Sequence, residues 1–104
     1  MDRQKRKRLE EAGWKIGSAG DFLGLTGEEE RLIDLRIALV QKVRAARLSS
    51  AMTQADLAGA IGSSQSRVAK LEAGEPNVSI DLIMKALLAL GLSNKEIGQS
   101  IAAA

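Results

Sequence analysis

The strongest constraint on the fold of this chain is a series of helix-start signals that recurs from residue 26 onward. A serine or threonine stands at each of these points and is followed by apolar residues three and four positions apart, the spacing of one helix face. Glycines after several of these stripes suit the left-handed conformation that ends a helix. The pattern predicts helices over about residues 26–48, 53–61, 65–73, 79–90 and from 93 onward, and therefore an all-α fold.

Two of these helices have broad predicted core faces. The stripe of the first helix consists of Leu32, Leu35, Leu39, Val43 and Ala46, widened by Ile33 and Val40. The stripe of the fourth helix consists of Ile80, Ile83, Met84, Leu87 and Leu88. Residues 26–29 (TGEE) and 93–96 (SNKE) also fit the capping box, in which two side chains each cap the other's backbone N–H. We expect these faces to pack on one core.

Residues 1–25 are predicted to be a short N-terminal extension of a domain formed by residues 26–104. Residues 14–16 could form a strand, but no partner strand is apparent elsewhere in the sequence. Trp14, Phe22 and Leu23 add apolar surface, which either covers the core or contacts a partner or second subunit.

The amino-acid composition excludes several kinds of chemistry. The chain has no cysteine, histidine or tyrosine, and it has one phenylalanine and one tryptophan. It therefore lacks disulfides, thiolate zinc sites, the commonest general base and an aromatic platform for single-stranded nucleic acid. The glutamates at positions 28–30 are explained by the favourable charge interaction at a helix start. We expect a cytoplasmic protein that is not an enzyme, uses no metal or cofactor and does not bind membranes.

Charge is distributed unevenly along the sequence. The basic block at residues 42–70 contains Lys42, Arg44, Arg47, Arg67 and Lys70 against Asp56 alone. Acidic residues predominate on both sides of this block, at 9–41 and 71–104. Such a layout is typical of a localised face that binds a polyanion, although each block also fits an ordinary solvated surface.

The segment 53–74 predicts two short helices joined by a tight turn at Gly62, which is the helix-turn-helix arrangement. It resembles the lambda-repressor-like (XRE) helix-turn-helix family. The matching residues are Arg47, residues 53–58, Gly62, residues 64–66, Val68, Leu71, Glu72, Gly74 and Ser79. The resemblance implies a five-helix DNA-binding domain that recognises double-stranded DNA and regulates transcription, most often as a repressor.

The third predicted helix is expected to contact base pairs. Its helical wheel turns Val68 and Leu71 inward, and the opposite side consists of Gln65, Ser66, Ala69 and Lys70. Small residues let a helix lie deep in the major groove, where Gln can pair with adenine and Lys with guanine, each good pair giving ~1–3 kcal/mol of discrimination. Arg67 lies on the flank and either contacts a base or binds a phosphate. The other interpretation of Ser66 and Ala69 is a solvated helix face.

Other residues are expected to bind the DNA backbone or to support the fold. Gln54 lies at a helix start, where backbone N–H groups favour phosphate, and the resemblance implies phosphate contacts for Gln54 and Ser64, with Asn77 as a weaker candidate. Helix capping alone is the other interpretation of Gln54 and Ser64. The resemblance also implies an ion pair between Arg47 and Glu72 that leaves guanidinium donors for a phosphate.

Two positions depart from the family pattern. Ala51 stands where the family usually has a glycine with positive φ, so it is predicted to cost roughly 1 kcal/mol or to change the turn. Ser63 replaces the usual apolar turn residue, which predicts a less firmly packed corner.

A single short helix contacts few base pairs, so we expect a homodimer on a palindromic operator, formed through the first helix or through Ile97 and Ile101. The layout is similar to HigA-like antitoxins of type II toxin–antitoxin pairs, which implies a RelE/HigB-like toxin partner and autoregulation. A stand-alone or phage-type repressor, or a protein-only adaptor with this fold, is the alternative. The basic residues at 3–8 either form an arm that contacts DNA or start a solubilising helix.

Overall fold

The computed structural model describes residues 26–104, so the predictions for residues 1–25 lie outside the described part of the chain. It contains the helices α3 (Gly27–Ser49), α4 (Gln54–Ala60), α5 (Gln65–Glu72), α6 (Ile80–Ala89) and α7 (Asn94–Ala102). Within this range there is no strand, and the predicted all-α, lambda-repressor-like architecture is confirmed. No helix among these residues is both long and apolar enough to cross a membrane.

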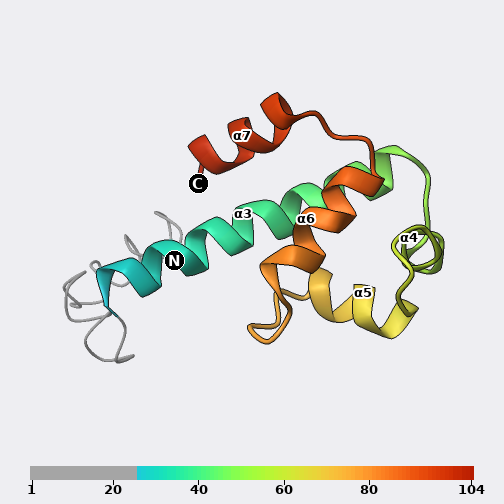
Figure 1. Cartoon of the computed structure of the whole chain (residues 1–104), viewed down its shortest axis with the longest axis horizontal. Coiled ribbons are helices and arrows are strands. Elements are labelled where there is room, and N and C mark those ends of the chain that lie inside the picture. Colours follow the sequence, from blue (N-terminus) through green and yellow to red (C-terminus); the bar gives the residue numbers. More distant parts are fainter. Residues whose placement is uncertain (1–25) are drawn as a thin grey trace, which may run out of the picture.

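The long helix α3 organises the other four. It packs against α5, α6 and α7, and α4 packs against α5 and α6 (Figure 1). Figure 1 shows α7 on one side of α3, and α4 and α5 together on the other side, near the end of α3 that leads into α4. The helix-turn-helix segment is therefore supported by the C-terminal half of α3 and by α6.

The start of each helix is capped by a hydroxyl, as the sequence predicts. The side chains of these residues accept a hydrogen bond from the backbone N–H three positions later: Thr26, Thr53, Ser64, Ser79 and Ser93. Complete capping boxes form at the start of α4 and α7. The box predicted at residues 26–29 is only half formed, because Glu29 donates its N–H to Thr26 while its side chain stays in solvent. There it still interacts favourably with the positive end of the helix.

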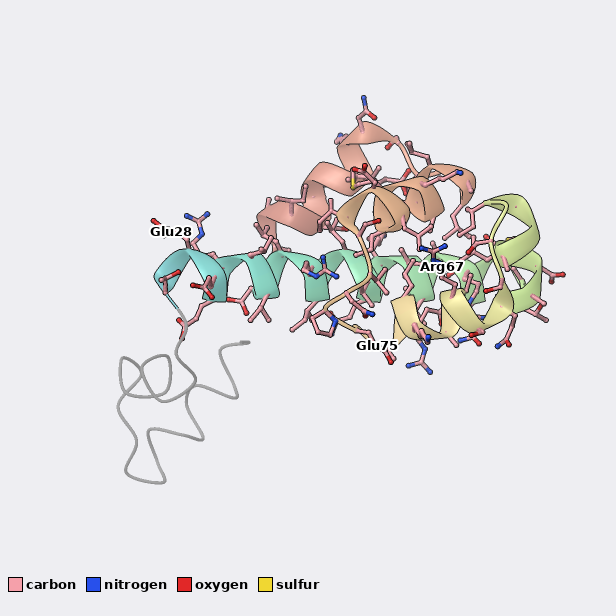
Figure 2. The ribbon with its side chains drawn as sticks, turned by 60° about the horizontal axis from the view of Figure 1, so that its bottom comes forward. Glu28, Arg67 and Glu75 are labelled. Carbon is pink, nitrogen blue, oxygen red and sulfur yellow. The ribbon has the colours of Figure 1, made fainter. Side chains whose placement is uncertain are left out.

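The core lies where α3, α4, α5, α6 and α7 meet. Its fully buried side chains are Val43, Leu57, Val68, Leu71, Ile83 and Leu87. The predicted core stripes are too long: Leu32, Ile33 and Leu88 are 51%, 38% and 58% exposed. The first two lie in the N-terminal part of α3, which extends past the other described helices towards Glu28 (Figure 2). Leu88 follows the buried Leu87 by one residue, about 100° around α6, and so faces away from the core.

Four helix ends share one geometry. Each has a residue with φ between 55° and 82°, followed by a residue whose N–H bonds back to the carbonyl five positions earlier, which is the Schellman motif. Three of these positive-φ residues are Gly62, Gly74 and Gly91, and the fourth is Ala51, with φ of 55°. Ala51 therefore adopts the left-handed conformation, and the turn is the same as at the three glycines. The predicted conformational free energy of an alanine in this region then destabilises the native structure.

The turn between α4 and α5 contains the second departure. The hydroxyl oxygen of Ser63 is buried and has no hydrogen-bond partner. A buried polar atom without a partner is unfavourable relative to an apolar group of similar size. Ser63 therefore stabilises this turn less than an apolar residue at the same position would.

Candidate nucleic-acid interface

The outer side of α5 is narrow and polar. Gln65, Ser66, Arg67 and Lys70 are exposed and Ala69 is partly buried, while Val68 and Leu71 hold the opposite side of the helix in the core. Helix α5 begins directly after its cap, Ser64, so the outward residues occupy its first two turns. Figure 2 shows side chains of α5 projecting away from the body of the helices.

A shallow hollow beside α5 brings further predicted residues to the same surface. Its walls are formed by Ser64, Ser66, Arg67, Lys70, Asn77, Val78, Ser79 and Leu82. Asn77 belongs to the loop between α5 and α6, and the hollow places it next to the side chains of α5. Three of the four predicted base-contacting residues, Ser66, Arg67 and Lys70, therefore share one surface with Ser64 and Asn77, two of the predicted phosphate-binding residues.

The loop that carries Asn77 is attached to α3 by a contact that sequence reasoning missed. The guanidinium of Arg36 donates to the backbone carbonyl of Val78, and the same nitrogen lies 3.3 Å from the carbonyl of Glu75. The available signal was a lone basic residue inside the apolar stripe of the first helix. A long side chain there can cover the core with its methylene groups and satisfy carbonyls at the edge.

Behind the interface, Arg47 of α3 and Glu72 of α5 form a nearly buried ion pair. Arg47 Nε lies 2.6 Å from Glu72 Oε2, Arg47 Nη2 lies 2.8 Å from Glu72 Oε1, and the side chains are 10% and 5% exposed. Arg47 Nη1 also donates to the carbonyl of Met52, in the turn that contains Ala51. One guanidinium thus joins α3, the α3–α4 turn and α5.

The ion pair shifts the titration of both groups. The hydrogen bond to Glu72 raises the pKa of Arg47 above its ordinary value. Burial is the largest influence on Glu72 and raises its pKa, but hydrogen bonds from Arg47 and Gln54, together with the charge of Arg47, hold that pKa below its usual range. Both groups are therefore charged at neutral pH. Three of the five N–H groups of Arg47 are directed inward, which gives it a structural role; the predicted phosphate contact through the other two N–H groups stays a prediction.

Two glutamines connect this pair to the outer side of α5. Gln54 Nε2 lies 3.4 Å from Glu72 Oε1, and Gln65 Nε2 lies 2.8 Å from Gln54 Oε1. The sequence predicts both glutamines as contact residues but not their contact with each other. Gln54 opens α4 and Gln65 opens α5, and the packing of α4 against α5 brings the two side chains together.

A short helix with polar outer residues, supported at its start by a preceding helix and a tight turn, defines a helix-turn-helix DNA-binding protein. The sequence matches the model of a helix-turn-helix family over residues 43–97, and the chain belongs to that family. This range includes all of the predicted contact residues. The family assignment makes the protein a DNA-binding transcription regulator. Comparison with curated proteins and with solved structures found no match.

Proposed function

We propose that this protein is a sequence-specific repressor that inserts α5 into the major groove of double-stranded DNA. The observation that carries the proposal is the exposed side of α5, where Gln65, Ser66 and Lys70 surround the small Ala69. A helix with such a side can approach base edges closely, and its longer side chains can form hydrogen bonds there.

The roles of the individual residues follow from their positions. Gln65, Ser66, Lys70 and Arg67 contact bases, and Gln54, Ser64 and Asn77 contact phosphates. Gln54 and Ser64 lie at the starts of α4 and α5, whose backbone N–H groups favour a negative charge. Phosphate contacts of this kind fix the position of a protein on the duplex, while the base contacts give specificity.

The charge layout supports this orientation. Figure 2 shows Glu28, which belongs to the acidic first turn of α3, at one end of the described helices and well away from Arg67. Repulsion between these glutamates and DNA is therefore small, while Arg67 and Lys70 lie on the side that faces the duplex.

We further propose that the repressor acts as a homodimer on a palindromic operator. An eight-residue helix contacts a short half-site, and a two-fold-related copy supplies the second half-site one helical turn away. The surface that suits a second copy is the N-terminal part of α3, where Leu32, Ile33 and Ile37 are exposed. Ile97, predicted as a dimer residue, is buried in the core, whereas Ile101 is exposed on α7.

Within this function we infer that the protein is an autoregulatory antitoxin. The support is the likeness to HigA-like antitoxins: a small helix-turn-helix domain with a short appended segment at residues 1–25. Co-expression with the product of a neighbouring reading frame tests it. A ribonuclease that arrests growth alone and is neutralised by this protein supports the antitoxin role. A lack of such a partner leaves a stand-alone or phage-type repressor.

The DNA-binding proposal is tested by selecting duplexes from a random pool and measuring affinity at several salt concentrations. We expect binding that weakens steeply with salt, because phosphate contacts release counterions. Gln65→Ala should relax base preference at one position by roughly tenfold, and Asn77→Ala, which removes a proposed phosphate contact, should weaken all duplexes alike. The matched control is Gln99→Ala, an exposed glutamine on α7. Absence of duplex binding, or binding that ignores salt, would instead favour a protein-only adaptor.

A further inference from the structure

Three polar side chains form a hydrogen-bonded series that runs from the interior to the outer side of α5. Glu72 accepts from Gln54, and Gln54 accepts from Gln65. The inner end is fixed by the two hydrogen bonds from Arg47 to the carboxylate of Glu72. The outer end is Gln65, the residue proposed to contact a base.

From this series we propose that Glu72 is a positioning residue: it dictates which way round Gln65 presents its side-chain amide to DNA, and thereby which base Gln65 prefers. The proposal rests on the DNA-binding function above and adds a specificity determinant that does not itself touch DNA.

The argument starts from the chemistry of the inner group. An ionised carboxylate only accepts hydrogen bonds, so Gln54 must turn its NH₂ group towards Glu72. The carbonyl of the Gln54 amide then points away, and the observed contact shows it 2.8 Å from Gln65 Nε2. An amide that is free to rotate by 180° exchanges its donor and its acceptor at little cost, but here each reversal would bring two acceptors or two donors together.

The consequence for DNA recognition is directional. With one N–H of Gln65 committed to Gln54, the amide retains its second N–H and its carbonyl oxygen in a fixed order. Adenine offers N7 as an acceptor and N6 as a donor in the major groove, and an amide held in one direction matches that order in one register only. At the same position a reversed amide would turn its NH₂ group towards the atom beside N7, which is a donor, N6, in adenine but an acceptor, O6, in guanine. Fixing the direction therefore favours adenine over guanine at that base pair.

The direct test is Glu72→Gln, which keeps the size of the side chain but supplies a group that both donates and accepts. In competition binding with duplexes that vary only at the base pair recognised by Gln65, we expect the preference of the wild type to fall by roughly tenfold. Preference at the base pair recognised by Lys70 should stay unchanged. Unchanged preference at both positions would overturn the proposal.

Two further variants separate positioning from a loss of structure. Arg47→Lys weakens the ion pair but keeps the carboxylate of Glu72, so it should lower thermal stability and leave the base preference intact. Gln54→Met removes the middle of the series without touching the ion pair, and it should reduce the preference as Glu72→Gln does, even if the latter folds poorly. Loss of preference in Arg47→Lys, or its retention in Gln54→Met, would contradict the assignment of Glu72.

The experiment also distinguishes this proposal from the one on which it rests. If the wild type shows no base preference in any duplex, the repressor function fails. If the wild type has a preference that Gln65→Ala abolishes and Glu72→Gln and Gln54→Met preserve, only the positioning role fails.

Discussion

At the scale of single residues, the structure separates positions proposed to contact DNA from positions that hold the fold. Arg47 and Glu72 are the clearest case, because the sequence pattern that places them in a DNA-binding family also suggests a phosphate contact for Arg47. In the structure the pair is almost covered, and its two hydrogen bonds are spent inside the protein. The sequence pattern predicts that Arg47 and Glu72 pair with each other. It does not show how exposed the guanidinium of Arg47 is, because that exposure depends on how α3 packs against α5.

Ala51 is a site where one substitution should stabilise the protein. Ala51→Gly removes the Cβ from a residue with φ of 55°. We expect the free energy of unfolding, measured in urea, to rise by about 1 kcal/mol. The matched control is Ala45→Gly, at an exposed helical position of α3, which should instead destabilise the protein by roughly 0.5–1 kcal/mol. Equal effects of the two substitutions would contradict the account of the turn.

The ion pair predicts a dependence of stability on pH. The folded state lowers the pKa of Glu72 below its ordinary value of 4.5, so its stabilisation is complete above that pH and is lost as the pH falls through the lower, folded-state pKa. At pH 7 we expect Glu72→Gln to reduce the free energy of unfolding by roughly 3 kcal/mol. Urea unfolding at pH 7 and at pH 3 gives the free energy of unfolding of the variant and of the wild type. The difference between the two proteins should be smaller at pH 3. A constant difference would show that the charge of Glu72 is not involved.

At the scale of elements, the helices could be predicted from the sequence because their starts and ends are local. A hydroxyl caps the start of each of these helices and a glycine follows the ends of α4, α5 and α6, through hydrogen bonds that span a few residues, and the observed bounds lie within about two residues of the predicted ones. The faces of the helices were less predictable. Leu32 and Ile33 continue the apolar stripe of α3 but lie beyond the helices that pack on it. Only the tertiary arrangement shows how much of α3 the other helices cover.

The loop between α5 and α6 depends on α3 through Arg36. Arg36→Met keeps an apolar stem but removes the hydrogen bonds to the carbonyls of Glu75 and Val78. We expect a loss of about 1–2 kcal/mol of stability and faster limited proteolysis at residues 74–78, because the carbonyl of Val78 loses its partner and the carbonyl of Glu75 keeps only the N–H of Val78. Arg31→Met, at an exposed position of the same helix, is the control and should change neither quantity. Unaltered proteolysis in Arg36→Met would mean that the loop holds its conformation without α3.

At the scale of the whole molecule, the candidate interface combines residues from three parts of the chain. The residues at 53–70 follow from the helix-turn-helix pattern, since they are close in sequence. Asn77 joins them through a loop, and Arg47 supports them from the preceding helix. The hydrogen bond between Gln54 and Gln65 could not be predicted, because it depends on side-chain conformations at the junction of two helices.

The proposed dimer is tested on the exposed part of α3. Ile33→Glu should convert the dimer to a monomer, measured by sedimentation velocity, because it places a charge in an apolar contact. Binding to a full palindrome should fall with it, while binding to a half-site should not. Leu48→Glu is the matched control, an exposed leucine near the other end of α3. A dimer that survives Ile33→Glu would place the two-fold axis elsewhere, for example at Ile101.

The ion pair from α3 to α5 has a consequence for redesign. Because Arg47 lies outside the segment 53–74, transplanting that segment alone into an unrelated scaffold would leave Glu72 without its counter-charge. Exchanging only Gln65, Ser66 and Lys70 within the native framework leaves this anchor untouched. New target specificities for this protein should therefore be sought by changing the outer side chains and not by grafting the motif.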